Sequence, residues 1–271
     1  MKFSVLMSLY YKENSLFFDN CLESIFNQSL QASEVVLVID GQIGSDLEEV
    51  ILKWKDILPI RIIRLNENVG LGNALNIGLK NCKYELIARM DTDDICMSNR
   101  FERQVLEFKK NPKLIICGSS ILEVDPDTLS PISKRIVPCQ KKAIWDELPW
   151  KNPFNHMTVM YKKEQIISVG SYKDLLYMED WYLWLRLLRS RQECLNINET
   201  LVIARTGSSM ISRRKGIDYI KSEWNIFRHK VVLGYPFFSS LFALLSRSMP
   251  RLLPNKALNM AYLVSRSVKK I

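Results

Sequence analysis

Residues 34–41 read EVVLVIDG, and this stretch decides the fold. The run from Val35 to Ile39 is wholly apolar and lacks the polar alternation of a half-exposed strand. Such a run is typical of a central strand in a parallel sheet, because helices cover both faces of that sheet. It ends at Asp40, and ligands of parallel α/β sheets bind beyond the carboxyl ends of the strands. The stretch therefore predicts a buried parallel strand and one side of a ligand site.

The segments on both sides of this run alternate between strand and helix patterns. Residues 15–28 carry apolar residues at helical spacing. Residues 45–48 (SDLE) fit a capping box that opens a helix towards Leu58, and Pro59 would end that helix. Further strands are expected at 3–9, 60–65, 85–90, 114–124 and 158–161, and further helices at 71–82, 98–110 and from 217 onward. This order predicts an α/β fold with a doubly wound, mostly parallel sheet and right-handed crossovers.

The composition is that of a globular protein, since 47% of the 271 residues are hydrophobic and 25% are charged. The six cysteines show no C-x-x-C pair and no zinc-like spacing with histidine, so we expect free thiols in a reducing compartment. Lys2 precedes a short apolar stretch without a small-residue cleavage site, which favours a first strand over a signal peptide. No apolar run reaches the roughly 18 residues that span a bilayer.

Almost all of the net charge of +9 comes from the C-terminal end of the chain. From Lys221 to Ile271 there are nine lysine or arginine residues and one acid, Glu223. The same segment carries a group of large apolar residues: Phe237, Phe238, Leu241, Phe242, Leu244 and Leu245. This mixture is typical of an interfacial helix on an anionic membrane. The alternative is a helix packed on the domain with a solvated basic face.

An acidic motif, Asp91-Thr92-Asp93-Asp94, follows the strand expected at 85–90. In an extended segment Asp91 and Asp93 point the same way, so both carboxylates can face one site. Carboxylate oxygens suit Mg²⁺ or Mn²⁺, and Mg²⁺ usually takes one or two of them together with substrate phosphates. The alternative is a solvated turn that caps the helix beginning near Ser98.

A second acidic pair, Glu179-Asp180, lies at the start of a helix that carries Trp181 and Trp184 on one face. The helix macrodipole stabilises a carboxylate there, so Glu179 is a candidate N-cap. Asp180 is a candidate general base that takes a proton from a substrate hydroxyl. The two tryptophans are expected to be packing residues, with a platform for a sugar ring as the alternative.

These motifs belong to a longer ordered set of stretches between residues 4 and 216. They are SVLMSLYYKEN (4–14), EVVLVIDG (34–41), LNENVGLGNALNIGL (65–79), ELIARMDTDDI (85–95), NRFERQ (99–104), NPFNHMTVMYKKEQIISVGSY (152–172), MEDWYLWLRL (178–187) and GSSMISRRKG (207–216). With this set the chain resembles a family 2 glycosyltransferase of the GT-A fold, the type that builds bacterial O-antigen and capsular polysaccharides. The order of the set is far more specific than any one motif.

The resemblance implies a role for each matching residue of the nucleotide side. Tyr10 would lie near the nucleotide base, with Glu13 close to the base or the ribose. Asp40 matches the residue that reads the uracil edge. The family often has Pro and Asn where this chain has Ser8 and Tyr11. That departure affects the fine placement of the base and leaves the metal site unaffected.

For the two acidic motifs the resemblance implies metal binding and catalysis. Asp91 would contact the ribose or the metal-bound nucleotide, and Asp93 would ligate the Mn²⁺ or Mg²⁺ that bridges the diphosphate. Asp94 is the neighbouring acid, with a less defined role. Asp180 matches the catalytic base of the family's Glu-Asp pair, whose other member is Glu179.

The implied reaction is inverting transfer of a hexose, glucose or galactose, from a UDP-sugar. The acceptor would be a sugar hydroxyl on a polyprenyl-diphosphate lipid, so we expect a cytoplasmic protein in peripheral contact with the anionic inner-membrane surface. Residues 1–215 would form the GT-A domain, with a nucleotide-sugar-binding half (1–110) and an acceptor half (111–215). Residues 216–271 would form a basic amphipathic helical extension.

Two further features remain open between functional and structural roles. Arg213, Arg214 and Lys215 follow a Gly-Ser-Ser stretch, and we predict a loop that closes over the donor diphosphate or an acceptor phosphate. A solvated basic turn is the alternative. His156 is expected to be either a hydrogen-bonded core residue or a contact to the acceptor.

Rival protein classes fit the sequence less well. A dinucleotide enzyme would need G-x-G-x-x-G after the first strand, and a sugar-phosphate nucleotidyltransferase would need a Gly-rich loop where Leu9-Tyr10-Tyr11-Lys12 stands. Nucleic-acid binding would explain the charge, but the basic residues cluster away from the acidic motifs. A non-catalytic binder of nucleotide sugars remains an alternative.

Overall fold

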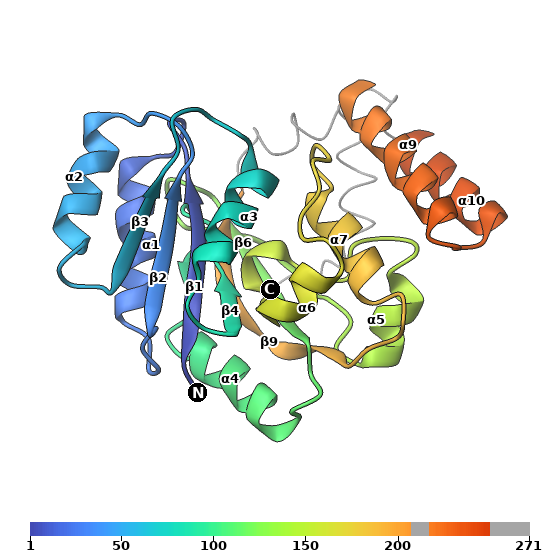
Figure 1. Cartoon of the computed structure of the whole chain (residues 1–271), viewed down its shortest axis with the longest axis horizontal. Helices are drawn as coiled ribbons and strands as arrows, with labels where there is room; N and C mark the ends of the chain where they lie inside the picture. The colour runs from blue at the N-terminus through green and yellow to red at the C-terminus, as the bar shows by residue number, and fades with distance from the viewer. Residues whose placement is uncertain (207–216, 250–271) are drawn as a thin grey trace.

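The computed structural model describes residues 1–206 and 217–249. The strands of this part form one nine-stranded sheet in the order β3-β2-β1-β4-β8-β6-β9-β5, with β7 paired to β6 (Figure 1). The strands are β1 (Phe3–Leu9), β2 (Glu34–Ile39), β3 (Ile60–Arg64), β4 (Leu86–Arg89), β5 (Ile95–Cys96), β6 (Ile116–Val124), β7 (Pro131–Arg135), β8 (Met160–Lys162) and β9 (Cys194–Arg205). The helices are α1 (Ser15–Phe26), α2 (Ser45–Trp54), α3 (Leu71–Asn81), α4 (Arg100–Lys110), α5 (Lys141–Glu147), α6 (Lys163–Ser168), α7 (Glu179–Leu187), α9 (Ile217–Val232) and α10 (Phe237–Ser248).

The strands β3, β2, β1 and β4 are all parallel, as the sequence predicts. Val5 of β1 pairs with Val35 of β2 on one side and with Ala88 of β4 on the other. Every residue of β2 is buried, which explains why that strand lacks polar alternation. The carboxyl ends of these strands therefore lie along one edge of the sheet.

Helices cover both faces of the sheet, so the fold is doubly wound. Val5 and Met7 of β1 pack in one core with α1, α2 and α4, whereas Leu6 packs in a second core with α3 and α7. Side chains of a strand alternate between the two faces, so one apolar strand contributes to both cores. Five of the six cysteines lie in these cores as free thiols, as expected.

The rest of the sheet mixes both strand directions. β8 runs antiparallel to β4 and to β6, while β6 and β9 are parallel along a long register with bulges. The strand expected at 158–161 is found at β8, two residues later. The long strand β9 was not predicted from the sequence pattern.

The capping box expected at Ser45 is wrong. α2 begins at Ser45, but its N-cap is Gly44, and no side chain caps the helix. Ser45 is already inside the helix, one position beyond the place from which a hydroxyl accepts the cap hydrogen bond. The helix ends at Trp54, and the segment expected to be its last turn is a turn in which the Leu58 N–H donates to the Trp54 carbonyl (3.0 Å).

The described part of the C-terminal extension is a helical hairpin, α9 and α10, which packs on α7 (Figure 1). Arg247 of α10 is ion-paired with the buried Glu223 of α9 (2.8 Å). Its guanidinium also lies 4.5 Å from the ring centre of Trp181 on α7. Among the described residues, every helix is too short or too polar to cross a membrane.

Candidate active site

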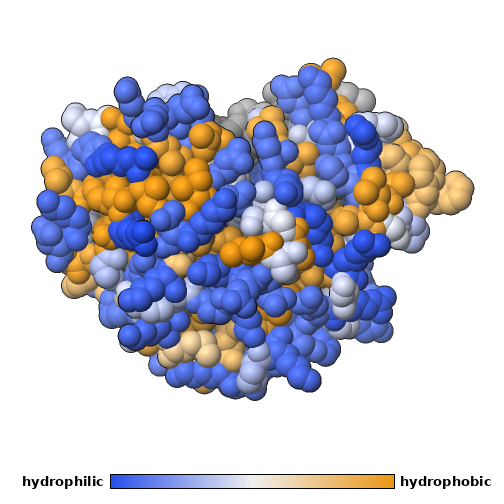
Figure 2. Space-filling model, viewed as in Figure 1, coloured by the Kyte–Doolittle hydropathy of each residue, from blue (hydrophilic) through white to orange (hydrophobic). Residues whose placement is uncertain are grey.

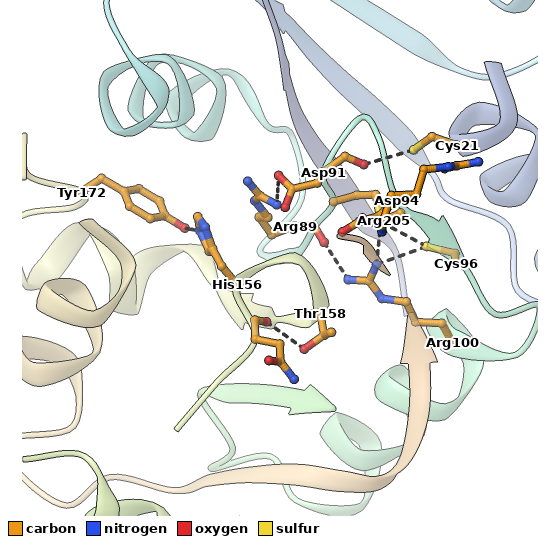
Figure 3. A network of polar contacts seen from close by, with 12 residues as sticks. Cys21, Arg89, Asp91, Asp94, Cys96, Arg100, His156, Thr158, Tyr172 and Arg205 are labelled. Carbon is orange, nitrogen blue, oxygen red and sulfur yellow. Dashed lines mark hydrogen bonds and ion pairs between the residues drawn. The ribbon is translucent and has the colours of Figure 1, made fainter. Parts of the chain in front are cut away.

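The acidic motif forms a turn directly after β4. Asp91, Asp93 and Asp94 each offer one carboxylate oxygen, and these oxygens lie within 4.8 Å of one another. Asp91 is ion-paired with the buried Arg89, the last residue of β4 (Figure 3). Asp94 accepts a hydrogen bond at Oδ1 from the backbone N–H of Arg205 (3.0 Å), while its buried Oδ2 has no hydrogen-bond partner among the described residues. The motif is therefore a compact cluster of oxygen ligands.

Burial and mutual repulsion oppose ionisation of this cluster. Burial, followed by the negative charge of Asp91, raises the pKa of Asp93 to about 6. Burial and the neighbouring charges of Asp93 and Asp91 also raise the pKa of Asp94 well above its ordinary value. A divalent cation would remove this repulsion, and carboxylate oxygens are the ligands that Mg²⁺ and Mn²⁺ prefer. The three residues therefore fit a divalent metal.

The fully buried Arg100 holds the backbone of the acidic motif in place. Arg100 of α4 donates from Nη2 to the Arg89 carbonyl (2.6 Å) and from Nη1 to the sulfur atoms of Met90 (3.0 Å) and Cys96 (3.1 Å). The Cys21 thiol donates to the Asp91 carbonyl (3.2 Å). These contacts hold both ends of the turn (Figure 3). The motif is thus preorganised by the sheet and α4 and does not depend on loop packing.

The second acidic pair begins α7. The N-cap is Met178, so the reading of Glu179 as the N-cap is wrong. Asp180 accepts at Oδ1 from the backbone N–H of Trp181 (2.6 Å) and at Oδ2 from the Nδ2 of Asn152 (2.6 Å). Both carboxylate oxygens are therefore held in place, and each keeps a second lone pair for a substrate proton.

Burial raises the pKa of both members of this pair. For Glu179, burial followed by the charge of Asp180 raises the pKa to about 7. Burial also raises the pKa of Asp180, while the hydrogen bonds from Trp181 and Asn152 work in the opposite direction. The pKa of Glu179 thus lies in the range in which general bases operate near neutral pH, and burial moves the pKa of Asp180 upward, towards that range.

The two acidic sites face the same region of the molecule. The negative charge of Asp91 adds to the causes that raise the pKa of Glu179, and the positive charge of Arg89 acts to lower the pKa of both Glu179 and Asp180. A Cβ built on Gly72, at the start of α3, would lie 3.8 Å from the Cβ of Glu179. The start of α7 therefore packs beside the start of α3, and the charge of Arg89 acts on both sets of carboxylates.

We predict that Asn152→Ala moves the acid limb of the kcat profile to higher pH. Asn152 stabilises the ionised form of Asp180, so its removal raises the pKa of that carboxyl further. A base must be ionised to accept a proton, so activity then requires a pH higher by about one unit. Measured kcat between about pH 5 and 9 tests this. Asn27→Ala, at the exposed end of α1, is the control, and an unmoved limb would exclude Asp180 as the limiting base.

On the nucleotide side, Asp40 holds the loop that leads into α3. Its carboxylate accepts from the backbone N–H groups of Val69 (2.7 Å) and Gly70 (3.1 Å), and its carbonyl accepts from Asn68. Tyr10 follows β1, and its carbonyl accepts from the backbone N–H of Glu13 (3.1 Å). The structure brings Tyr10 and Asp40 to the strand ends, and their contacts to a base stay a prediction.

Other predicted residues have structural partners. His156 hydrogen-bonds through Nε2 to the Tyr172 hydroxyl (2.9 Å), which agrees with the reading as a hydrogen-bonded residue. Burial, followed by the charge of Arg89, lowers its pKa well below the ordinary value. Trp181 and Trp184 are buried, which confirms that they are packing residues. The predicted loop residues Arg213, Arg214 and Lys215 lie outside the described residues.

Three functional residues were missed in the sequence reasoning. Arg89 balances the charge of both acidic sites, Arg205 donates to Asp94 and to the Asp93 carbonyl, and Asn152 orients Asp180. Arg89 stands two residues before the acidic motif, so its position was a usable signal. Arg205 is 111 residues from Asp94, and Asn152 is 28 residues from Asp180, so neither gives a local signal.

This sheet, with a cluster of carboxylates at the end of β4 and a second acid pair beside it, defines a transferase of the GT-A fold class. The structure matches that of S. aureus TarS 1–349 in complex with UDP-GlcNAc, with a TM-score of 0.68 at 17% identity, over 91% of this chain and 71% of that one. The family description "Glycosyl transferase family 2" matches residues 4–175. The chain belongs to glycosyltransferase family 2.

Two relatives resemble the chain along nearly its whole length. The amylovoran biosynthesis glycosyltransferase AmsE of Erwinia amylovora is 41% identical over 261 residues, covering 96% of this chain and 97% of the relative. The UDP-Gal:alpha-D-GlcNAc-diphosphoundecaprenol beta-1,3-galactosyltransferase of Escherichia coli is 36% identical over 260 residues, covering 93% of this chain and 92% of the relative. The predicted family and the GT-A fold are thereby confirmed.

Proposed function

We propose that the chain transfers a hexose, glucose or galactose, from a UDP-sugar to a sugar hydroxyl of a polyprenyl-diphosphate-linked acceptor, with inversion. The product would serve bacterial surface polysaccharide synthesis of the O-antigen type. The proposal is supported by two sets of carboxylates that both feel the charge of Arg89, one set fit for a metal and the other for a base. The names of the amylovoran and galactosyltransferase relatives support the substrate classes.

On the donor side, Asp93 and Asp91 would hold Mn²⁺ or Mg²⁺, with Asp94 beside them. The bound metal would neutralise negative charge that develops on the leaving diphosphate. Tyr10, Glu13 and Asp40 would contact the base and ribose, and Arg213 and Arg214 would close over the phosphates.

On the acceptor side, Asp180 takes the proton of the attacking hydroxyl as its oxygen bonds to the anomeric carbon. The bond from that carbon to the UDP oxygen breaks on the opposite face, so a single displacement inverts the centre. Asn152 and the Trp181 N–H keep the Asp180 carboxylate oriented during this step. Glu179, with its pKa near 7, is the neighbouring acid that completes the pair.

The lipid portion of such an acceptor stays in the bilayer, so the protein would work at the cytoplasmic face of the inner membrane. The excess of cations in residues 221–271 supports peripheral contact with an anionic surface.

A panel of nucleotide sugars, offered with a synthetic lipid-diphosphate N-acetylhexosamine, tests the proposed reaction. We expect UDP release that requires Mn²⁺ or Mg²⁺ and a product lengthened by one hexose. Release of pyrophosphate would indicate a nucleotidyltransferase instead. Saturable binding of a UDP-sugar, without transfer to any acceptor and without hydrolysis of the UDP-sugar, would indicate a non-catalytic binder.

A further inference from the structure

The helix α10 exposes large apolar side chains on its outer side, although Ala243 and Leu244 also pack inward. Phe238 is 83% exposed and Phe242 is 65% exposed, whereas Ser240 of the same helix is buried. A surface helix normally turns its apolar side chains inward and its polar side chains outward. Phe238 and Phe242 therefore face outward, although each keeps a ring-edge contact, to Phe237 (5.6 Å between ring centres) and to Trp150 (6.4 Å) respectively.

These side chains form one continuous group, which we call the apolar face. Its members are Val232, Phe237, Phe238, Phe242, Leu245 and Met249. Those from Phe238 to Met249 recur at helical spacing along α10, and Val232 joins them from the end of α9. Figure 2 shows apolar surface over this hairpin, at the right-hand margin of the molecule. Contiguous apolar patches of this kind mark interaction sites on soluble proteins.

The hairpin that presents the apolar face is firmly attached to the domain. Its inner side carries the buried ion pair of Glu223 with Arg247, and Lys230 is also buried there. The Tyr235 hydroxyl donates to the Leu185 carbonyl of α7 (3.2 Å). The inner side of the hairpin thus combines these polar contacts with buried apolar residues such as Ile226 and Leu244, and this attachment leaves the apolar face outward.

The charge of this region indicates what covers the apolar face. The described hairpin carries four cations (Lys221, Arg228, Lys230 and Arg247) and two acids (Asp218 and Glu223), and residues 250–271 of the sequence add five cations and no acid. An exposed apolar helix face within such a cationic segment of the sequence matches the headgroup boundary of an anionic bilayer. A protein partner would have to bring a matching acidic rim, whereas an anionic membrane supplies negative charge over its whole surface.

We propose that the α9–α10 hairpin is the membrane-docking element, and that its apolar face enters the boundary between headgroups and acyl chains. The inference rests on the proposed function in one respect: membrane docking serves the reaction because the proposed acceptor is linked to a lipid. His229 of α9 stacks on Tyr182 of α7 (4.1 Å between ring centres), and α7 begins beside Asp180. Docking of the hairpin thus fixes the orientation of the candidate base relative to the bilayer that holds the acceptor.

Vesicle flotation with the full chain tests the docking. Wild-type protein is expected to float with vesicles that contain phosphatidylglycerol and to stay behind with purely zwitterionic phosphatidylcholine. The double variant Phe238→Ser/Phe242→Ser should lower the partition coefficient by at least about tenfold. Its melting temperature should not fall, because both rings are exposed. The control variant Leu16→Ser/Leu52→Ser removes two exposed apolar side chains (62% and 57% exposed) from α1 and α2 and should float like wild type.

Turnover assays then separate this inference from the proposed function. Transfer to a long-chain acceptor in vesicles should fall with the partition coefficient in the double variant, and transfer to a short-chain soluble acceptor should not change. Equal flotation of wild type and double variant overturns the docking element. So does a wild-type dimer that the double variant converts to monomers without any vesicle binding. If the protein floats as expected but transfers sugar to no acceptor, the proposed reaction is wrong and the docking proposal stands.

Discussion

Asp180→Asn is expected to lower kcat by about a thousandfold while the KM for the donor changes by less than about twofold. The amide keeps the size of the carboxylate and can still accept from the Trp181 N–H, so the start of α7 should stay intact. It cannot accept the proton of the attacking hydroxyl, and loss of a general base typically costs a factor of this order. Single-turnover rates at saturating donor and acceptor measure the effect.

Two further variants test whether Asp180 is the base. Asp174→Asn changes an exposed acid in the loop that precedes α7 and should leave kcat unchanged. If Asp180→Asn loses less than about tenfold while Glu179→Gln loses far more, Glu179 is the base and the assignment within the pair is wrong.

Asp93→Asn is expected to abolish metal binding and to lower kcat by at least about a thousandfold, because the leaving diphosphate then lacks its counter-charge. The variant leaves the backbone contacts of the turn in place, since Arg100 and Cys21 hold carbonyl groups and sulfur atoms. Calorimetric titration with Mn²⁺ measures the loss of binding, and UDP release measures the loss of turnover. Asp127→Asn, an exposed acid beyond β6, serves as the control.

The same variant should make the metal-free protein more stable at neutral pH. The pKa of Asp93 is raised from its ordinary value of 3.8 to about 6 in the folded state. Between those values the folded state holds a proton that the unfolded state has released, so stability falls as the pH rises through this window and stays lower above it. In EDTA, the melting temperature of wild type should therefore drop from pH 4 to pH 7 more than that of Asp93→Asn. An identical pH dependence in both proteins would contradict the repulsion described at this site.

The first half of the fold was predictable because its signals are local. EVVLVI is apolar enough to require cover on both faces, and acids directly after strands mark the sheet edge where ligands bind. The strand β9 gives no such signal. Its sequence, CLNINETLVIAR, mixes polar and apolar residues, and its burial follows from bulged pairing with β6.

The acidic residues of the candidate site were predictable from the sequence, but the residues that hydrogen-bond to them were not. Asp91 and Asp93 are two residues apart and Glu179 and Asp180 are adjacent, so short separation in the sequence alone places the members of each group near one another. The residues that hydrogen-bond to these acids come from distant parts of the chain. Arg205 lies at the end of β9, and Asn152 lies in the segment before η1 (His156–Thr158). Such contacts depend on how the strands pair, which a single sequence does not specify.

The strand order also has a consequence for how the protein is made. β4 receives its neighbour β8 only after residue 160, and Asp94 receives its hydrogen bond only from Arg205. While the ribosome has delivered only the first 110 residues, the edge of β4 is unpaired and the carboxylates after it lack that partner. The two expected halves of the domain thus share one sheet, and a fragment of the first half should aggregate through this open edge. The turn that carries the three aspartates is complete only once β9 has been synthesised.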